Sequence, residues 1–294
     1  MKPAESQIHP TLPLEGEREG GLKPEEPLDP TFDLSHFNPE GSLLRRQQHR
    51  MMEMLLVLDE ICRRHGIRYW LAAGTLLGAV RHKGYIPWDD DLDIELLRPD
   101  YDRLLRILPT ELPDYLQLQT PDTDPGYFFT YAKLRDRRSR MLETNTYDRI
   151  FHMQGIFIDI FPMERVPQWL RWVSCRTLGR CYKVLKRKDL TDDEARRRVR
   201  RIYAVNRRFI FPVLNALSAL TPFKRKIRYS LGVPYDDIRL SEWLFPLTTT
   251  EFEGHQMPVP ADCEAYLTCK FGNWRQLPPL ESIHVHAEQL EIDD

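Results

Sequence analysis

The most constraining feature of this chain is a glycine turn followed, fifteen residues later, by three acids at alternate positions. The run GTLLGAVRHKGYIPWDDDLDI contains Gly74 and Thr75 at the turn and then Asp89, Asp91 and Asp93. In a strand, residues two apart share a face, so three carboxylates are expected along one side of a short element. Such crowding is unfavourable unless a cation or solvent offsets the charge. Carboxylate oxygens suit Mg²⁺ or Mn²⁺, so the pattern predicts a metal site for chemistry on phosphate.

Two other interpretations of the acidic run were considered. A short D-x-D pattern is also typical of an exposed acidic turn, because such motifs often match by chance. A calcium loop starting at Asp89 would need glycine at its sixth position, which is Ile94 here, so that interpretation fails.

A fourth acid stands inside an apolar run. Asp159 stands inside GIFIDIF, residues 155–161, which is predicted to be a buried strand. A carboxylate there costs several kcal/mol unless it is paired or metal-bound. Its expected partner is either a cation such as Arg135 or the metal site of Asp91 and Asp93.

Length and composition favour one large domain or two modest ones, with 294 residues and an apolar content of 41%. No apolar run approaches the 18 residues of a spanning helix, and the N-terminus has no secretory-signal pattern. Five cysteines without framework spacing favour reduced thiols and a cytoplasmic protein, and their spacing does not fit a zinc knuckle.

Alternating helical and strand patterns predict an α+β fold (or α/β) with a mixed sheet. Four parts are expected: a disordered tail over 1–40, a catalytic core over 41–164, a basic helical insertion over 165–232, and a C-terminal part over 233–294 that completes the core and ends in an acidic tail. The expected helices are 43–65, 75–82, 99–108, 169–186, one opening at Thr191 and kinked at Pro212, and 261–271. The expected strands are 67–73, 91–97, 115–119, 127–134, 139–143 paired with the preceding one, 155–161, and a hairpin near 244–259.

Residues 165–228 are strongly basic. They hold nineteen Lys or Arg and four acids, a net charge of +15 in a chain whose total is −2. Three interpretations stay open: a solvated arginine-rich helix packed on the core, peripheral contact with an anionic membrane, or nucleic-acid binding, the least favoured.

Four segments of the chain resemble the LicD family, which includes fukutin-type proteins. They are GTLLGAVRHKGYIPWDDDLDI, YAKLRD, GIFIDIFPME and FEGHQMPVP, and the resemblance runs from about residue 50 to 280. It implies a polymerase-β-like nucleotidyltransferase core and transfer of a phosphorylated alcohol, such as phosphocholine or ribitol phosphate, from a CDP-linked donor to a glycan. Asp89, Asp91, Asp93 and Asp159 match the family's acidic metal-site positions, and Gly74 and Thr75 match its glycine turn. The zinc insertion of fukutin-type proteins has no visible counterpart.

The chemistry of diphosphate cleavage assigns roles to the same acids. Two divalent ions can hold the attacking and the leaving oxygen. Asp91 and Asp93 are expected to be the principal metal ligands and Asp89 an outer or bridging ligand. Asp159 is expected to bind the second metal and to accept the proton of the acceptor hydroxyl.

Further residues are expected to bind the donor. Backbone N–H groups of Gly74, Thr75 and Leu76 at a helix start can cradle phosphate. Lys133 and Arg135 alternate on one strand face and can balance the diphosphate charge, or instead form salt bridges with surface acids. Arg81 can touch phosphate or lie at a solvated helix end, and His255 in FEGHQMPVP can line the pocket or be structural.

The sequence therefore predicts a metal-dependent transferase with a CDP-linked donor and a glycan, lipopolysaccharide or lipid-linked glycan acceptor, working in the cytoplasm or peripherally on the inner face of the membrane. One alternative is a nucleotidyltransferase that adds a nucleoside monophosphate and releases pyrophosphate. Another is a non-catalytic glycan or membrane adaptor on the same fold.

Overall fold

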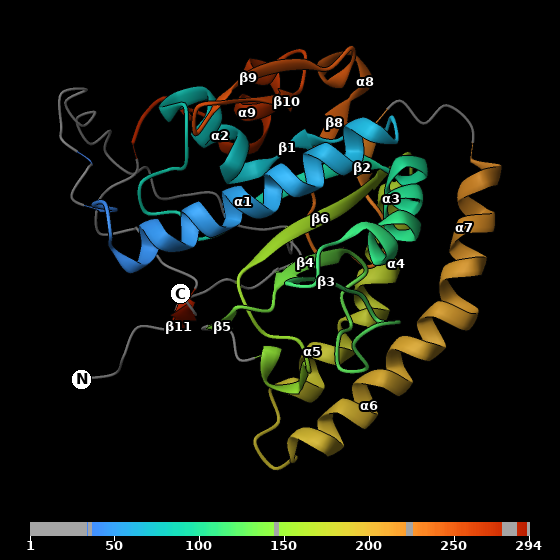
Figure 1. The fold of residues 1–294 in the computed structure, drawn as a ribbon. Coiled ribbons are helices and arrows are strands. Elements are labelled where there is room, and N and C mark those ends of the chain that lie inside the picture. The colour runs from blue at the N-terminus through green and yellow to red at the C-terminus, as the bar shows by residue number, and fades with distance from the viewer. Residues whose placement is uncertain (1–33, 35–36, 144–146, 222–225, 278–286, 293–294) are drawn as a thin grey trace, which may run out of the picture.

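The computed structural model describes residues 34, 37–143, 147–221, 226–277 and 287–292 (Figure 1). Nearly all of the tail predicted over 1–40 lies outside these residues. Within them the chain forms a seven-stranded mixed sheet with helices packed on it, which confirms the prediction of an α+β fold with a mixed sheet.

The sheet is built around one long central strand, β6 (Phe157–Glu164). The strand order is β1-β2-β6-β4-β3, and β7 joins the far end of β6 and carries β8. The pairing of β2 with β6 is parallel and the other pairings in this sheet are antiparallel. The remaining strands are β1 (Trp70–Leu71), β2 (Asp93–Leu97), β3 (Leu116–Gln119), β4 (Ala132–Asp136), β7 (Lys226–Tyr229) and β8 (Ile238–Leu240). Because β7 belongs to the sheet, the helical insertion ends before it, earlier than the predicted residue 232.

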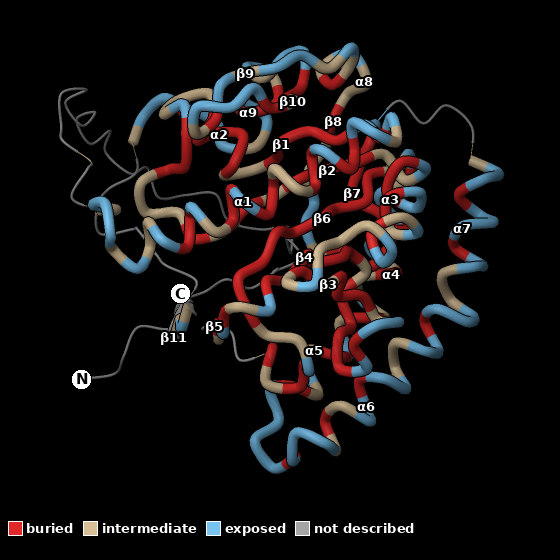
Figure 2. Tube along the Cα trace, viewed as in Figure 1, coloured by how far each residue is buried: buried red, intermediate tan, exposed pale blue. Residues whose placement is uncertain are grey.

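One face of the sheet is apolar and is covered by two helices. Alternation along the strands places Ile94, Ile158 and Ile160 on this face, and all three are buried. The covering helices are α1 (Leu43–Arg64), which Ser42 caps, and α3 (Arg98–Glu111), and both contact β6. Figure 2 shows their inner sides as buried and their outer sides as exposed. The opposite face is left for the polar residues of β2, β4 and β6.

The C-terminal part covers the start of α2 (Ala73–His82). It comprises α8 (Ser241–Leu244), the hairpin β9 (Thr248–Phe252) and β10 (His255–Val259), and α9 (Cys263–Phe271). The predicted hairpin is thus confirmed. Its turn residue Glu253 bonds to the loop after α2, since its carboxylate accepts the Tyr85 N–H at 3.1 Å and pairs with Arg45 at 2.8 Å.

The prediction that 139–143 pairs with the preceding strand is wrong. The strand β5 (Ser139–Glu143) pairs with β11 (Ala287–Ile292), in the segment predicted to be an acidic tail. The physical reason is that β4 is already flanked by β3 on one edge and β6 on the other.

The insertion forms four helices along one side of the molecule (Figure 1). The helix predicted over 169–186 is divided at Gly179 into α4 (Gln168–Leu178) and α5 (Arg180–Leu185). The helix start predicted at Thr191 is confirmed, because Thr191 and Glu194 bond reciprocally in a capping box at the start of α6 (Asp192–Val205). A π-helical turn, Asn206–Ile210, joins α6 to α7 (Phe211–Leu220).

Candidate active site

The start of α2 is the tight glycine turn that the sequence predicts. Ala73 has a φ of 46°, an uncommon backbone conformation for a residue with a side chain, and its N–H donates to the Tyr266 hydroxyl at 3.2 Å. A Cβ on Gly74 would lie 2.8 Å from an oxygen of the Asp89 carboxylate. Glycine is therefore required for the Asp89 side chain to lie against the backbone of this helix start.

The helix start is also tied to the acidic strand. The Thr75 hydroxyl accepts the backbone N–H of Asp93 at 2.8 Å. Leu76 donates its own N–H to the Ala72 carbonyl at 2.9 Å, within the first turn of the helix. The predicted phosphate cradle therefore loses Leu76, and the amides at its disposal are those of Gly74 and Thr75.

Two glutamines of α1 hold the acidic loop. Gln48 donates to the Asp89 carbonyl at 2.9 Å and Gln47 donates to the Asp90 carbonyl at 2.6 Å. Both glutamine side chains are buried. Because these carbonyls are bonded to α1, the loop does not run as a strand here.

Only Asp93 of the three alternating acids lies in the strand. β2 begins at Asp93, and Asp89 and Asp91 precede it in irregular chain, so the prediction that a strand face aligns all three is wrong. The loop nevertheless holds Asp89 and Asp91 close to Asp93. Asp89 and Asp91 share a side-chain hydrogen bond, and Asp91 influences the pKa of Asp93.

Asp93 and Asp159 are direct neighbours across the parallel pair β2 and β6. Asp159 in turn faces Lys133 across the antiparallel pair β6 and β4, and Lys133 faces Gln119 on β3. Directly opposite residues point to the same face of a sheet, so these four side chains form one row across four strands. The register thus brings together two acids that are 66 positions apart in the sequence.

Lys133 contacts the buried Asp159 carboxylate. Its ammonium lies 2.9 Å from Asp159 Oδ1, 3.6 Å from Glu143 Oε1 and 3.2 Å from the centroid of the Phe157 ring. The sequence offered Arg135 or a metal as the partner of Asp159, and the structure gives Lys133 instead. The alternative of salt bridges holds in part, because Lys133 and Arg135 do form ion pairs with acids. These acids are the buried Asp159 and the partly buried Glu143 rather than surface acids, and Lys133 itself is only 2% exposed.

Arg135 is buried and its guanidinium is committed to the protein. It donates to Gln119 Oε1 at 2.8 Å and to the Gly155 carbonyl at 2.7 Å, and it lies over the Phe157 ring at 4.7 Å. These contacts make Arg135 a structural support for the row rather than a phosphate ligand.

The acids raise one another's pKa values. Burial, together with the charges of Asp91 and Asp93, raises the pKa of Asp89 well above its ordinary range. Burial, Asp91 and Asp159 do the same for Asp93. Burial raises the pKa of Asp159 to about 6, although Lys133 opposes that shift. The cluster therefore carries more negative charge than its surroundings neutralise.

The described residues contain no group of three or more His, Cys, Asp or Glu side chains already arranged to hold a metal ion. The four aspartates are instead held in two parts, with Asp89 bonded to Asp91 and Asp159 bonded to Lys133. Their oxygens are the ligand type that Mg²⁺ and Mn²⁺ prefer, and a cation would relieve their repulsion.

Arg81 lies near the cluster but points its donors elsewhere. Its Nη1 donates to the Trp274 carbonyl at 2.8 Å, and its Nε donates to His82 Nε2 at 2.8 Å. Asp89 is close enough to influence the Arg81 pKa, which burial lowers. Burial and the charge of Arg81 lower the pKa of His82 to about 4.

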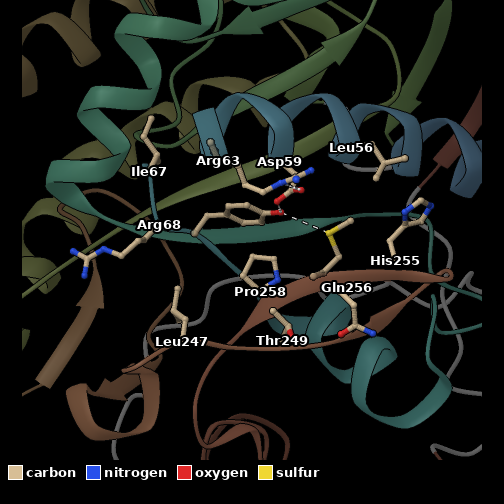
Figure 3. A pocket seen from close by; sticks show the side chains of 13 residues that line it. Leu56, Asp59, Arg63, Ile67, Arg68, Leu247, Thr249, His255, Gln256 and Pro258 are labelled. Atoms are coloured by element: carbon tan, nitrogen blue, oxygen red, sulfur yellow. Dashed lines mark hydrogen bonds and ion pairs between the residues drawn. The ribbon is translucent and has the colours of Figure 1, made fainter. Parts of the chain in front are cut away.

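His255 lies in a different place from the acids. It is exposed on β10 and lines a cavity of about 420 Å³ between α1 and the β9–β10 hairpin (Figure 3). Asp59, Arg63 and Arg68 also line this cavity, and none of the four predicted aspartates does. The structure therefore does not bring His255 to the candidate site.

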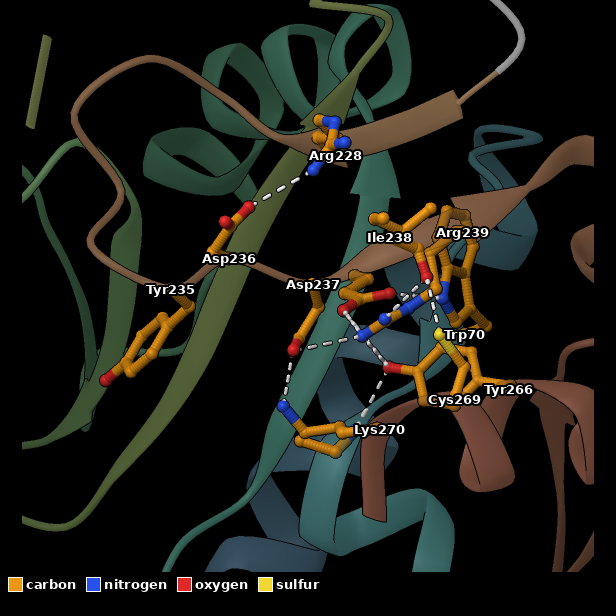
Figure 4. A network of polar contacts seen from close by, with 12 residues as sticks. Trp70, Arg228, Tyr235, Asp236, Asp237, Ile238, Arg239, Tyr266, Cys269 and Lys270 are labelled. Carbon is orange, nitrogen blue, oxygen red and sulfur yellow. Dashed lines mark hydrogen bonds and ion pairs between the residues drawn. The ribbon is translucent and has the colours of Figure 1, made fainter. Parts of the chain in front are cut away.

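A buried polar network that the sequence does not predict includes Trp70, Arg239 and Tyr266 (Figure 4). Glu95, two residues after Asp93, accepts hydrogen bonds from Trp70 at 2.9 Å, Arg239 at 3.0 Å and Tyr266 at 3.1 Å. The position of Glu95 on the Asp93 face could have been read from the alternation. Its partners could not, because Arg239 is 144 residues away.

Lys270 on α9 was also missed. It forms an ion pair with Asp237 and lies near enough to lower the pKa of Asp93 against the main effect of burial. Asp237 has a lowered pKa because the charges of Lys270 and Arg239 outweigh its burial. A cation is thus present at the edge of the acidic cluster, where a phosphate group would need one.

Two comparisons show which known proteins the chain resembles over most of its catalytic part. Residues 66–177 match the family described as LicD/FKTN/FKRP, nucleotidyltransferase domain. The chain is 28% identical over 271 residues to the lipopolysaccharide cholinephosphotransferase LicD of Haemophilus influenzae, covering 84% of this chain and 96% of that protein. It is therefore homologous to a transferase.

Shorter stretches resemble two further proteins. Over 35 residues the chain is 54% identical to the human ribitol 5-phosphate transferase FKRP, which is 12% of this chain and 7% of that protein. Over 59 residues it is 54% identical to the uncharacterized protein RP689 of Rickettsia prowazekii, covering 20% of this chain and 22% of that protein.

Proposed function

Because the chain carries a LicD-family domain, we propose that it transfers a phosphorylated alcohol from a CDP-linked donor to a glycan or lipopolysaccharide acceptor. The observation that carries the proposal is the pairing of Asp93 with Asp159 on adjacent strands, with the Asp89 carboxylate against the Gly74 turn. The printed names of two relatives, a cholinephosphotransferase and a ribitol 5-phosphate transferase, support phosphocholine or a polyol phosphate as the transferred group.

The four aspartates Asp89, Asp91, Asp93 and Asp159 would hold Mg²⁺ or Mn²⁺. The donor set supports this, since it consists of carboxylate oxygens, and burial together with the charges of the neighbouring acids raises the pKa values of Asp89 and Asp93. When bound, the metal would supply Lewis-acid stabilisation of the charge that develops on the diphosphate.

The chain's own residues would bind the donor phosphate and accept the proton. The N–H groups of Gly74 and Thr75 at the start of α2 would bind a donor phosphate, because a helix N-terminus favours anions. Asp159 would accept the proton of the attacking hydroxyl, and a pKa of about 6 suits a base that works near neutrality. Lys133, at 2.9 Å, would fix the orientation of that carboxylate.

The acceptor side of the proposal is a glycan, either free or attached to lipid. A lipid-linked acceptor would require the enzyme to work at a membrane surface, which agrees with peripheral contact through residues 165–228. None of the helices in the described ranges has the length and apolar character needed to cross a bilayer.

The test is turnover on a panel of CDP-alcohols with Mg²⁺, measured as release of CMP. We expect release with one donor class, loss of it when divalent ions are removed, and loss in Asp91→Ala and Asp93→Ala with the fold intact. Asp102→Ala is the control, because Asp102 is an exposed acid on α3 that pairs with Arg98.

Two outcomes would replace the proposal. Release of pyrophosphate from a nucleoside triphosphate would identify a nucleotidyltransferase, for which the same acids would serve. Specific binding of glycan with no turnover of any donor, and no effect of Asp93→Ala, would identify a non-catalytic adaptor.

A further inference from the structure

The helices of the insertion expose large apolar side chains. These residues, which we call the α4–α7 surface, are Trp169, Trp172, Phe209, Val213, Leu217 and Leu220. Phe209 is 65% exposed and Leu220 is 80% exposed. Isolated exposed apolar residues are ordinary, but several on two neighbouring helices indicate an interaction surface.

The exposed residues follow the helical repeat. Phe209, Val213, Leu217 and Leu220 are spaced by four, four and three positions, so they lie along one side of the helix that ends in α7. A different side, marked by Leu214, packs on α4 in a small core of its own. Figure 2 shows α7 at the edge of the molecule with much of its length exposed. This helix therefore has one apolar side packed on the protein and another turned to solvent.

The second helix contributes two tryptophans. Trp169 and Trp172 are three positions apart on α4, so they share a side of that helix, and both are exposed. The guanidinium of Arg176 lies 5.4 Å over the Trp172 ring, which places a cation directly beside the apolar side chains. Tryptophan flanked by arginine is typical of residues at a membrane–water interface.

Charge selects the occupant of this surface. No acid occurs between Ala195 and Tyr235, a stretch that contains eleven basic residues. Arg207 pairs with Asp122 and Arg228 pairs with Asp236, so the available charge comes from other residues of the stretch. They include the exposed Arg197, Arg200, Arg201 and Arg208. A second copy of the chain on the α4–α7 surface would bring these like charges together. An anionic lipid headgroup would meet them with opposite charge, at about 1 kcal/mol for each Lys or Arg near the surface.

We propose that the α4–α7 surface binds the headgroup and upper acyl region of an anionic bilayer, holding the protein peripherally. Not every arginine of α6 is available for contact with lipid. Arg196 donates to the Ile150 carbonyl at 2.8 Å and pairs with Asp193, so part of the α6 arginine cluster is occupied within the protein. The apolar residues of α7 and α4 provide the insertion, and the exposed arginines provide the attraction.

The test is co-sedimentation of the full chain with phosphatidylcholine vesicles, with and without phosphatidylglycerol, at low and high salt. We expect binding to the anionic vesicles at low salt and partial release by salt. Phe209→Ser with Leu217→Ser should weaken binding roughly a hundredfold, about tenfold for each side chain. Leu43→Ser with Phe271→Ser is the matched control, because both residues are similarly exposed on α1 and α9 and should leave binding unchanged.

A second measurement locates the contact. Brominated acyl chains should quench tryptophan fluorescence in the wild type, and Trp169→Phe with Trp172→Phe should remove most of the quenching while retaining binding. Wild-type protein that ignores anionic vesicles at low salt would overturn the proposal. So would a dimer in solution that the Phe209→Ser, Leu217→Ser variant dissociates, which would identify a second copy as the occupant. Neither measurement uses turnover, so failure here is distinct from failure of the proposed transferase activity.

Discussion

The buried pair of Glu95 and Arg239 gives the sharpest prediction about stability. Both side chains are 0% exposed, and the Glu95 carboxylate accepts from Arg239, Trp70 and Tyr266. Replacing Arg239 with Met removes the cation and leaves the carboxylate buried beside two neutral donors. Removing one partner of such a pair costs about 3–5 kcal/mol. For a chain of this size that corresponds to a fall in Tm of roughly 10 °C, at about 2–4 °C per kcal/mol.

The assay is urea unfolding of three variants with an unchanged m value. Arg239→Met alone should lose the full amount, and adding Glu95→Gln should restore most of it, because the uncompensated charge is then gone. Arg275→Met is the control, since Arg275 pairs with Glu264 on the surface and its loss should cost far less than the loss of Arg239. If Arg239→Met proves no less stable than the double variant, the cost does not come from an unpaired buried charge and the reasoning fails.

The consequence for the site follows from the Tyr266 hydroxyl. It donates to Glu95 and accepts from both Arg239 and the Ala73 N–H at the start of α2. Loss of Arg239 should therefore also loosen the glycine turn. Amide exchange at Gly74 and Thr75 should become faster in Arg239→Met than in the wild type.

Three further predictions concern the acids and their neighbours. Mg²⁺ at a hundredfold excess over its Kd should raise the free energy of unfolding of the wild type by about 2.7 kcal/mol, and so raise its Tm. Asp93→Asn should lose this response and Asp102→Asn should keep it. An equal shift in all three proteins would refute metal binding at the cluster. Asp159→Asn should lower kcat about a hundredfold or more with little change in donor KM, whereas a rise in KM alone would make Asp159 a donor-positioning residue. The stability of the protein should fall as the pH falls from 6.5 towards 4, because the unfolded chain protonates His82 before the folded protein does. His82→Gln should flatten the dependence of stability on pH across that range. An unchanged slope would show that the burial of His82 beside Arg81 does not cause the loss.

Local patterns account for what the sequence predicted correctly. The apolar stripe of α1, the Thr191 capping box and the turn of the β9–β10 hairpin are specified by residues within a few positions of one another. The mixed sheet was also predicted, and the cost of burying the Asp159 carboxylate predicted that it has a partner, which is Lys133. These inferences succeed because the period and the burial cost are readable from neighbouring residues.

Long-range pairing accounts for what the sequence did not predict. The residue facing Asp159 depends on the register of β4 against β6, and a shift of one position would turn the Lys133 side chain away. The partner of β5 depended on which sheet edges were already filled. The chain at Asp89 is irregular because two glutamines of α1 donate hydrogen bonds to the backbone carbonyls of Asp89 and Asp90. The spacing of residues within the loop does not indicate these bonds.

The two acids of β2 explain why the site lies at one end of this strand. Glu95 is fully buried and is neutralised within the protein by Arg239. Asp93, two residues earlier on the same face, is half-buried, and its neighbours Asp91 and Asp159 add negative charge that Lys270 and Lys133 offset only in part. Because the negative charge at this end is not fully offset within the protein, we expect a cation or a cation-bound donor to approach at the Asp93 end. The same argument predicts that loss of Arg239 lowers the stability of the fold before it affects turnover. Loss of the Asp93 carboxylate should instead lower turnover and leave the fold intact.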